Sequence, residues 1–141
     1  MRRLALCLLP LALAACDSGD VVGSALVLTA SPERVVVGTD VTAVVANETD
    51  GPLYLHQCNG LRLGLQRWVD GEWETESSPL GPCQDLYDQS PLRLDAEAET
   101  STSVVVRSPG TYRLWTTYGT GPDYSTFAET AVSEPFEVVA P

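Results

Sequence analysis

Apolar residues alternate with polar ones along most of the chain after residue 24, and no run of ten or more residues has the spacing of an amphipathic helix. Side chains with a period of two lie on opposite faces of a β-strand. In residues 61–66 every second residue is a leucine, which predicts a strand with its leucines inside and an outer row that includes Gly64. Asp70-Gly71 is a strong signal for a tight hairpin turn, because both residues tolerate a positive φ angle. The chain is therefore predicted to be nearly all β.

The predicted strands are short, and turn-forming residues separate them. They cover residues 25–29, 34–37, 41–45, 53–55, 61–69, 72–75, 92–94, 102–106, 111–115 and 135–139. We interpret the first two as one strand that Ser31-Pro32 splits. Residues 77–90 and 119–125 lose the alternation and are predicted to be loops. This spacing of strands favours an all-β, immunoglobulin-like two-sheet antiparallel sandwich, with an open β-barrel as the alternative.

Two similarities support the sandwich. Tyr112 follows Ser108-Pro109-Gly110 at the start of a late predicted strand, a position that resembles the tyrosine corner of immunoglobulin-like domains. The order of turns and core residues across 40–118, with Leu65–Trp73 and Pro109–Tyr112 as its main marks, resembles a bacterial immunoglobulin-like family named for an intracellular proteinase inhibitor of bacilli. This second resemblance implies the fold more firmly than it implies inhibition, because its marks are turns and core positions that many sandwiches share.

The first sixteen residues form a distinct segment. Arg2 and Arg3 precede an apolar run, residues 4–15, that contains Pro10 and ends immediately before Cys16. This run is too short to cross a bilayer as a helix, which takes about 20 residues. The arrangement resembles the lipobox of exported bacterial lipoproteins.

The lipobox resemblance implies a division of the chain into three parts. These are a signal peptide at residues 1–15, a flexible tether at 16–24 that begins with the lipidated thiol of Cys16, and the sandwich domain at 25–141. Two or three acyl chains would anchor the protein stably in a membrane. The resemblance also implies a place in the cell envelope, on the inner or outer membrane and facing the periplasm or the exterior. An ordinary secretory signal with an unmodified Cys16 is the alternative.

Four cysteines are present, and two of them belong to the N-terminal segment. Cys7 would leave with the signal peptide and Cys16 would carry lipid, so Cys58 and Cys83 remain as an even pair. An exported protein meets an oxidising compartment, where disulfides persist. Closing the intervening loop would stabilise the fold by about 3 kcal/mol on the chain-entropy estimate. We therefore predict a disulfide between Cys58 and Cys83.

The charge of the chain is strongly acidic. It has 19 acidic residues, eight arginines and no lysine, for a net charge of −11. Without residues 1–15, which hold two of the arginines, the net charge is about −13. Such a surface repels phosphates, so we expect no nucleic acid as a partner and no electrostatic adhesion to anionic lipid headgroups.

The residues that carry chemistry are few. His56 is the only histidine. A zinc site made by His56, Cys58 and Cys83 is an alternative, but a disulfide would consume both thiols. No Gly-x-Ser-x-Gly motif supports a Ser-His-Asp triad. Acidic residues in and after the first loop offer a calcium site as an alternative, although their spacing matches no EF-hand and we interpret them as solvated. They are Asp85, Asp88, Asp95, Glu97 and Glu99. We expect no catalytic residues, no metal, no cofactor and no enzyme activity.

Two classes of function fit this chain. The first is a non-catalytic interaction module of the cell envelope that binds an unidentified envelope protein or a glycan. The second is a proteinase-inhibitor-like domain that acts through an exposed loop. The candidate interaction surface comprises Trp68 and Trp73, which flank the predicted hairpin, with Leu86 in the first loop and Tyr124 in the second. We also expect at least one of the three tryptophans to pack in the core.

Overall fold

The computed structural model describes residues 25–84 and 88–141, which form eleven strands and one short 3-10 helix. The strands are β1 (Leu26–Ser31), β2 (Arg34–Val36), β3 (Asp40–Asn47), β4 (Leu53–Leu55), β5 (Gly64–Val69), β6 (Glu72–Ser77), β7 (Leu92–Leu94), β8 (Glu99–Val105), β9 (Gly110–Gly119), β10 (Glu129–Val132) and β11 (Phe136–Val139). The 3-10 helix, η1, covers Tyr124–Thr126. In the described parts of the chain, no helix has the length and apolar character needed to cross a membrane.

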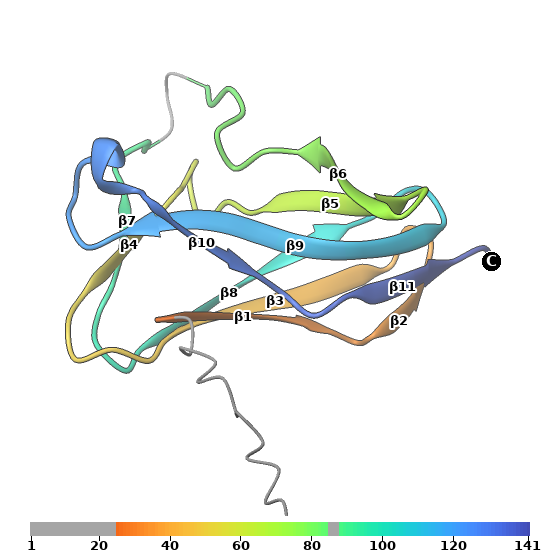
Figure 1. The fold of residues 1–141 in the computed structure, drawn as a ribbon, viewed down its shortest axis with the longest axis horizontal. Coiled ribbons are helices and arrows are strands. Elements are labelled where there is room, and N and C mark those ends of the chain that lie inside the picture. The colour runs from red at the N-terminus through yellow and green to blue at the C-terminus, as the bar shows by residue number, and fades with distance from the viewer. Residues whose placement is uncertain (1–24, 85–87) are drawn as a thin grey trace, which may run out of the picture.

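The strands form two sheets that face each other (Figure 1). The small sheet has the order β1-β3-β8, and the large sheet follows β2-β11-β9-β4-β7, with β10 and the β5–β6 hairpin joined to β9. The long strand β9 is the spine of the large sheet, because β11 and β10 pair along one edge of it and β5 and β4 along the other. The prediction of a two-sheet, immunoglobulin-like sandwich is confirmed, and the open-barrel alternative is wrong.

The first strand is split, as the sequence predicts, and the structure places its two parts in different sheets. β1 pairs antiparallel with β3 in the small sheet, whereas β2 pairs parallel with β11 in the large sheet. The Ser31-Pro32 peptide bond, which is cis, lies where the chain leaves β1. One short stretch of sequence therefore contributes an edge strand to each sheet.

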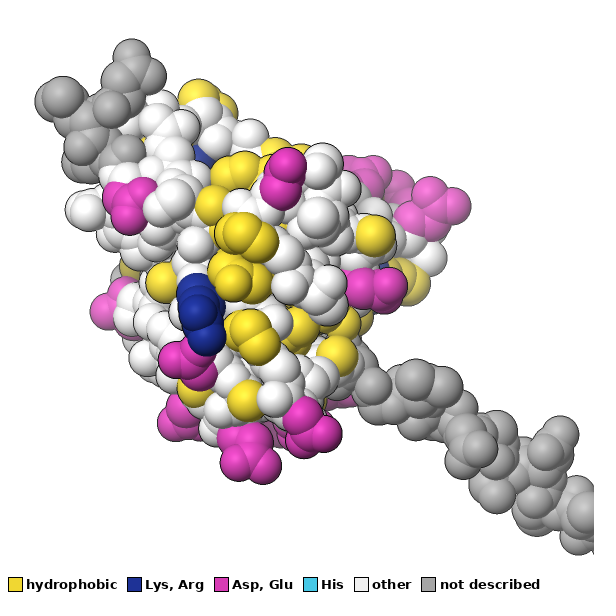
Figure 2. Space-filling view, turned by 90° about the vertical axis from the view of Figure 1, so that its left-hand side faces the viewer, with side chains coloured by type: hydrophobic (Ala, Val, Ile, Leu, Met, Phe, Trp, Pro, Cys, Tyr) yellow, Lys and Arg dark blue, Asp and Glu magenta, His cyan; other side chains and the backbone are white. Residues whose placement is uncertain are grey.

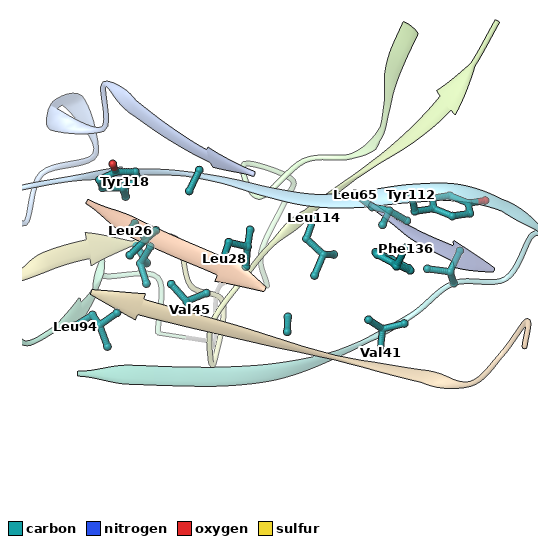
Figure 3. Packing of buried hydrophobic residues seen from close by; sticks show 14 of the residues in the cluster. Leu26, Leu28, Val41, Val45, Leu65, Leu94, Tyr112, Leu114, Tyr118 and Phe136 are labelled. Carbon is teal, nitrogen blue, oxygen red and sulfur yellow. The ribbon is translucent and has the colours of Figure 1, made fainter. Parts of the chain in front are cut away.

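The hydrophobic core lies between the sheets and comes from alternate positions of the strands (Figure 3). In β9 the side chains at every second position, Tyr112, Leu114, Thr116 and Tyr118, are buried, and the half-buried residues between them face outward. The buried residues labelled in Figure 3 are Leu26, Leu28, Val41, Val45, Leu65, Leu94, Tyr112, Leu114, Tyr118 and Phe136. The hydroxyl of Tyr112 donates to the carbonyl of Ser108 at 3.0 Å, which is the bond that the tyrosine-corner resemblance implies.

The predicted alternation across residues 61–66 is wrong at Gly64. β5 begins only at Gly64, and this glycine is buried instead of lying in an exposed outer row. A Cβ atom at Gly64 would lie 2.2 Å from Nε1 of Trp115 and 2.8 Å from Cδ of Pro79. These two side chains cover the outer face of the strand here. The prediction of an exposed outer row fails because the periodicity of one strand gives no information about which side chains of other segments pack against its outer face.

Two other expectations also differ from the structure. The strand β10 was not predicted, because it is only four residues long and three of the four are exposed. The expectation of a tryptophan in the core is wrong, since Trp68 is exposed and Trp73 and Trp115 are half-buried. In β9 the inward positions belong to its tyrosines, Leu114 and Thr116, so Trp115 lies on the outer face.

Candidate functional site

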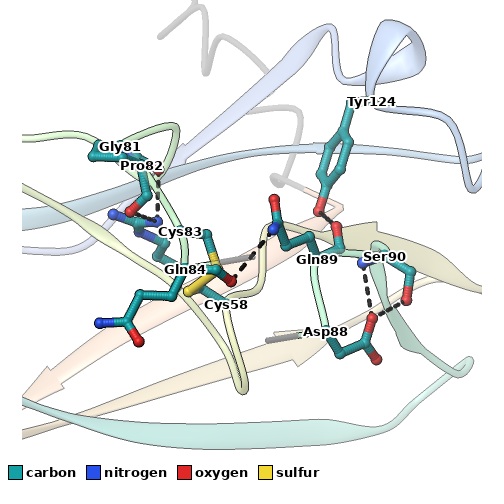
Figure 4. The surroundings of a disulfide bond; sticks show 10 residues. Cys58, Gly81, Pro82, Cys83, Gln84, Asp88, Gln89, Ser90 and Tyr124 are labelled. Carbon is teal, nitrogen blue, oxygen red and sulfur yellow. Dashed lines mark hydrogen bonds between the residues drawn. A yellow bond between two sulfur atoms is a disulfide. The ribbon is translucent and has the colours of Figure 1, made fainter. Parts of the chain in front are cut away.

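A disulfide joins two distant segments at one end of the large sheet. Cys58, which follows β4, is bonded to Cys83 in the long loop after β6, with the sulfur atoms 2.03 Å apart. The predicted disulfide is confirmed, and it consumes both thiols of the alternative zinc site. In Figure 4 the disulfide lies between the loop that carries Gly81 and the segment that carries Gln89.

The loop that contains Cys83 is held in place by Arg62 as well as by the disulfide. Nη1 of Arg62 donates to the carbonyl of Gly81 at 2.7 Å and to that of Pro82 at 3.1 Å. Within the loop, the N–H of Gly81 donates to the carbonyl of Ser78 at 3.2 Å, which closes a turn. Leu80 lies in this turn and is 67% exposed. The loop is therefore fixed on both sides of an exposed leucine.

The loop after β9 faces this disulfide loop and contains η1. Its N-cap is Asp123, whose side chain accepts from the backbone N–H of Ser125 at 2.9 Å. The hydroxyl of Tyr124 then donates to the carbonyl of Gln89 at 2.5 Å, as Figure 4 shows. The two regions that were predicted as loops are thus joined by a hydrogen bond between residues 35 positions apart.

Three aromatic rings form a cluster under this contact. The imidazole of His56 stacks on the ring of Tyr124 with the centroids 5.0 Å apart and an interplanar angle of 3°. Phe127 meets both rings edge to face, with centroid distances of 4.8 Å to His56 and 5.0 Å to Tyr124. Nε2 of His56 is hydrogen-bonded to Oγ1 of Thr117 at 2.8 Å. The cluster anchors η1 to the outer face of β9.

The electrostatics of the cluster follow from its burial. His56 is only 4% exposed. Burial, and to a smaller extent the neighbouring guanidinium of Arg62, lowers the pKa of His56 below its usual 6.5, so the imidazole is neutral at pH 7. Burial raises the pKa of Tyr124 above 10. Hydrogen bonds from Ser90 lower the pKa of Asp88.

These elements enclose a pocket of about 430 Å³. Its lining comprises His56, Gln57, Arg62, Gln89, Tyr124 and the loop 79–83. The volume falls within the range of about 300–1,000 Å³ that is usual for small-molecule sites. One wall carries aromatic rings, another carries prolines and Leu80, and polar donors come from Arg62 and the two glutamines. The pocket is the candidate functional site.

The Trp68 and Trp73 side chains form a second, separate surface. They face each other across the β5–β6 hairpin, edge to face, with centroids 5.1 Å apart. The guanidinium of Arg113 lies 4.4 Å from the centroid of the Trp73 ring and its Nε donates to Gln66 at 2.8 Å. The hydrogen bond to Gln66 positions the guanidinium of Arg113, and its contact with the ring fixes the orientation of Trp73. Trp68 remains 45% exposed. In Figure 1 the turn between β5 and β6 lies at the opposite end of the large sheet from η1.

The predicted surface residues therefore do not form one surface. Tyr124 lies at the pocket, and Trp68 and Trp73 lie at the far hairpin. Leu86 and Cys16, the residue predicted to carry lipid, lie outside the described residues. Sequence reasoning missed Arg62, Gln89 and Phe127. Arg62 follows the polar pattern of its strand-like segment, so nothing in the sequence marked it as the residue that fastens a loop 19 positions away.

The acidic residues are spread over the surface. Figure 2 views the left-hand end of Figure 1, where hydrophobic side chains gather in a central band and acidic side chains lie around it. Several of the carboxylates bond locally: Asp88 accepts from Ser90, and Asp95 forms an ion pair of 2.8 Å with Arg93. Within residues 25–84 and 88–141, no three His, Cys, Asp or Glu side chains are grouped so that they could hold a metal ion.

Comparisons with known proteins find similarity in solved structures only. No protein-family model matches the chain, and no curated protein matches its sequence. The chain is similar to WR4, a Caenorhabditis elegans MSP family member, at 11% identity and a TM-score of 0.39, covering 81% of this chain and 97% of that one. It is similar to the CARDB domain of the PF1109 protein from Pyrococcus furiosus, solved with di-metal ions, at 15% identity and a TM-score of 0.38, covering 81% and 87%.

A third similarity is to the alkylpurine DNA glycosylase AlkC of Pseudomonas fluorescens, solved with DNA containing an abasic site analog. It has 11% identity and a TM-score of 0.39, and covers 82% of this chain but only 31% of the glycosylase. Similarities at this level assign the chain neither a family nor an activity.

Proposed function

We propose that this chain is an exported, lipid-anchored protein of the cell envelope whose sandwich domain is a non-catalytic binding module. The pocket between the disulfide loop and η1 carries this proposal. Binding sites in sandwich domains are commonly built from the loops at the ends of the sheets, where a rigid scaffold positions them. Here the disulfide, the Arg62 hydrogen bonds and the Tyr124–Gln89 hydrogen bond fix both loops before a ligand arrives.

The chemistry of His56 supports a binding role over a catalytic one. A general base needs a nitrogen within reach of a substrate proton and a pKa near the working pH. His56 is buried, its Nε2 is engaged by Thr117, and Tyr124 and Phe127 pack against its ring. Because its pKa is lowered, the imidazole is neutral at pH 7, and its contacts give it a structural role in the aromatic cluster.

The anchor is supported by the N-terminal motif and the disulfide. Lipid on Cys16 would hold the domain at a membrane surface in a compartment where Cys58 and Cys83 stay oxidised. Replacing Cys16 with alanine should move the full-length protein from the membrane fraction to the soluble fraction of cells. Retention of the variant in the membrane fraction would contradict the lipid anchor.

Photo-crosslinking of the full-length protein in intact cells tests the binding module. Probes at Leu80 and Tyr124 sample the pocket, and a probe at Val105, which is 42% exposed on the small sheet, is the matched control. The proposal expects one dominant adduct, a protein or a glycan, from both pocket probes and not from Val105. Adducts of lipid alone, or the same adducts in equal yield from all three probes, would contradict it.

A proteinase-inhibitor-like role is the second candidate, and the exposed Leu80 favours it. Inhibitors of this kind present an exposed side chain on a loop that is rigid before binding. The prolines and the disulfide give the loop that rigidity, although the turn closed by Ser78 and Gly81 is tighter than an extended strand. Titration against a panel of proteases tests it. One-to-one inhibition that is lost in Leu80→Ser would favour this candidate, and slow cleavage of the loop would reject it.

A further inference from the structure

Tyr124 presents a partly exposed aromatic ring at the pocket. The ring of His56 stacks parallel to it at 5.0 Å, Phe127 meets it edge to face at 5.0 Å, and Tyr124 remains 40% exposed. The hydroxyl is held by the carbonyl of Gln89, so the ring has a fixed orientation. An aromatic face that is fixed and open to solvent is a platform for an apolar but water-soluble surface, such as the C–H face of a pyranose ring.

Polar groups face the same pocket from its other walls. Nη1 of Arg62 is committed to the carbonyls of Gly81 and Pro82, which fixes the plane of the guanidinium. Within the described residues, Nε and Nη2 of Arg62 make no hydrogen bond or ion pair and remain available as donors. The side-chain amide of Gln89 donates one N–H to the carbonyl of Gln84 at 3.4 Å, and that of Gln57 is hydrogen-bonded to the carboxylate of Asp88. Each amide keeps its oxygen as an acceptor and a second N–H as a donor. Fixed donors and acceptors beside an aromatic face match adjacent hydroxyl groups.

The charge around the pocket argues for a neutral ligand. Arg62 is the only charged side chain of the lining within the described residues, so a cationic ligand would be repelled at short range. Asp88 lies in the segment next to Gln89, and its carboxylate is kept ionised by Ser90. Arg62 would attract an anionic ligand at the same range, but that carboxylate and a net charge of −11 with no lysine oppose this attraction, so a neutral ligand is favoured.

We propose that the pocket binds a neutral saccharide of one or two pyranose rings. This inference rests on the proposed binding function and names its ligand. One ring packs its apolar face on Tyr124, opposite Pro79 and Leu80, and its hydroxyls accept from Arg62 and exchange hydrogen bonds with the glutamine amides. The pocket volume of about 430 Å³ accommodates a short end or branch of a glycan and not a longer enclosed chain.

The test measures binding of neutral oligosaccharides to the full-length, oxidised protein. The protein is kept in a detergent without a sugar headgroup, so that the detergent does not compete. The probes are the tetrasaccharides of the chitin, cellulose and starch series, measured by saturation-transfer NMR and calorimetry, with the corresponding charged uronic-acid oligomer as the comparison. We expect saturable binding of at least one neutral probe and at least about tenfold weaker binding of the charged one, a difference equivalent to about 1.4 kcal/mol.

Three variants locate the binding. Tyr124→Ala should weaken binding by about tenfold or more, because it removes the stacking face. Arg62→Met keeps the aliphatic stem and removes the donors, and should weaken binding several-fold with the Cys58–Cys83 disulfide still holding the loop. Trp68→Ala removes an exposed aromatic ring at the far hairpin and should leave the affinity unchanged. Thermal unfolding of each variant checks that the domain is folded.

Several outcomes would overturn the inference. They are no binding across the panel, tighter binding of the charged oligomer, an affinity unchanged by both Tyr124→Ala and Arg62→Met, and loss of binding in Trp68→Ala. If no saccharide binds but the crosslinking probes at Leu80 and Tyr124 capture one protein, the saccharide inference fails and the proposed binding function stands.

Discussion

Replacing Gly64 with alanine tests whether the outer face of β5 is as closely covered as the structure indicates. The new Cβ would lie 2.2 Å from Nε1 of Trp115 and 2.8 Å from Cδ of Pro79. The indole must move by at least about 1.2 Å to restore an ordinary contact, and its Nε1 donates to the carbonyl of Ser77 at 3.2 Å. The shift therefore strains both the packing and a hydrogen bond.

The expected loss in the free energy of unfolding is the sum of three contributions. Overpacking costs about 1–3 kcal/mol, and the weakened indole hydrogen bond adds up to about 1 kcal/mol. The lower backbone entropy of alanine in the unfolded chain offsets about 0.4–1 kcal/mol. We expect Gly64→Ala to lower the free energy of unfolding by about 2 kcal/mol. For a domain of this size the melting temperature should fall by about 8 °C.

Calorimetry of the oxidised protein measures this effect, with Gly51→Ala as the matched control. No heavy atom lies within 4 Å of a Cβ at Gly51, so the control should stay within about 0.5 kcal/mol of the parent. In a Trp115→Val background the cost of Gly64→Ala should fall by at least half, because the atom in closest conflict is gone. The reasoning would be refuted if Gly64→Ala lowered the free energy of unfolding equally in the unsubstituted protein and in Trp115→Val, or if the Gly64→Ala variant were as stable as the Gly51→Ala control.

Three further predictions concern the disulfide, the tyrosine corner and pH. Replacing both Cys58 and Cys83 with serine should lower the free energy of unfolding by about 3 kcal/mol, measured by urea denaturation, and no loss would contradict a stabilising role for the loop constraint. Tyr112→Phe should lower the free energy of unfolding by about 1 kcal/mol in the same assay, because the hydrogen bond to Ser108 is lost while the ring remains. An unchanged urea midpoint would argue against a stabilising role for this hydrogen bond. Burial lowers the pKa of His56 below 6.5, so below pH 6.5 the unfolded chain binds the proton first. As the pH falls from 6.5 to the pKa of His56 in the folded protein, the free energy of unfolding of the unsubstituted protein should therefore decrease relative to that of His56→Gln. The same pH dependence of the free energy of unfolding in both proteins would refute this prediction.

The candidate site was only partly visible in the sequence. The disulfide followed from counting cysteines, and Tyr124 was singled out as an exposed aromatic residue in a loop. That Tyr124 stacks on His56, and that both lie beside the disulfide, depends on where β4 and the end of β9 meet in the large sheet. The fastening of the disulfide loop by Arg62 likewise depends on the path of a loop with no periodic pattern. Such contacts join segments tens of residues apart and leave no local signal.

The sequence by itself determined the class of fold, the tight turn at Asp70-Gly71, the split first strand and the pairing of Cys58 with Cys83. These features depend on the alternation of apolar and polar residues, on backbone angles that few residues tolerate, and on the number of cysteines. All three are visible in the sequence without knowledge of the tertiary structure. Only the tertiary structure decided which side chains cover Gly64, which tryptophans stay outside the core and which residues line the pocket. Those outcomes are decided by competition among distant segments for the same space, so they emerge only when the two sheets and their loops have packed.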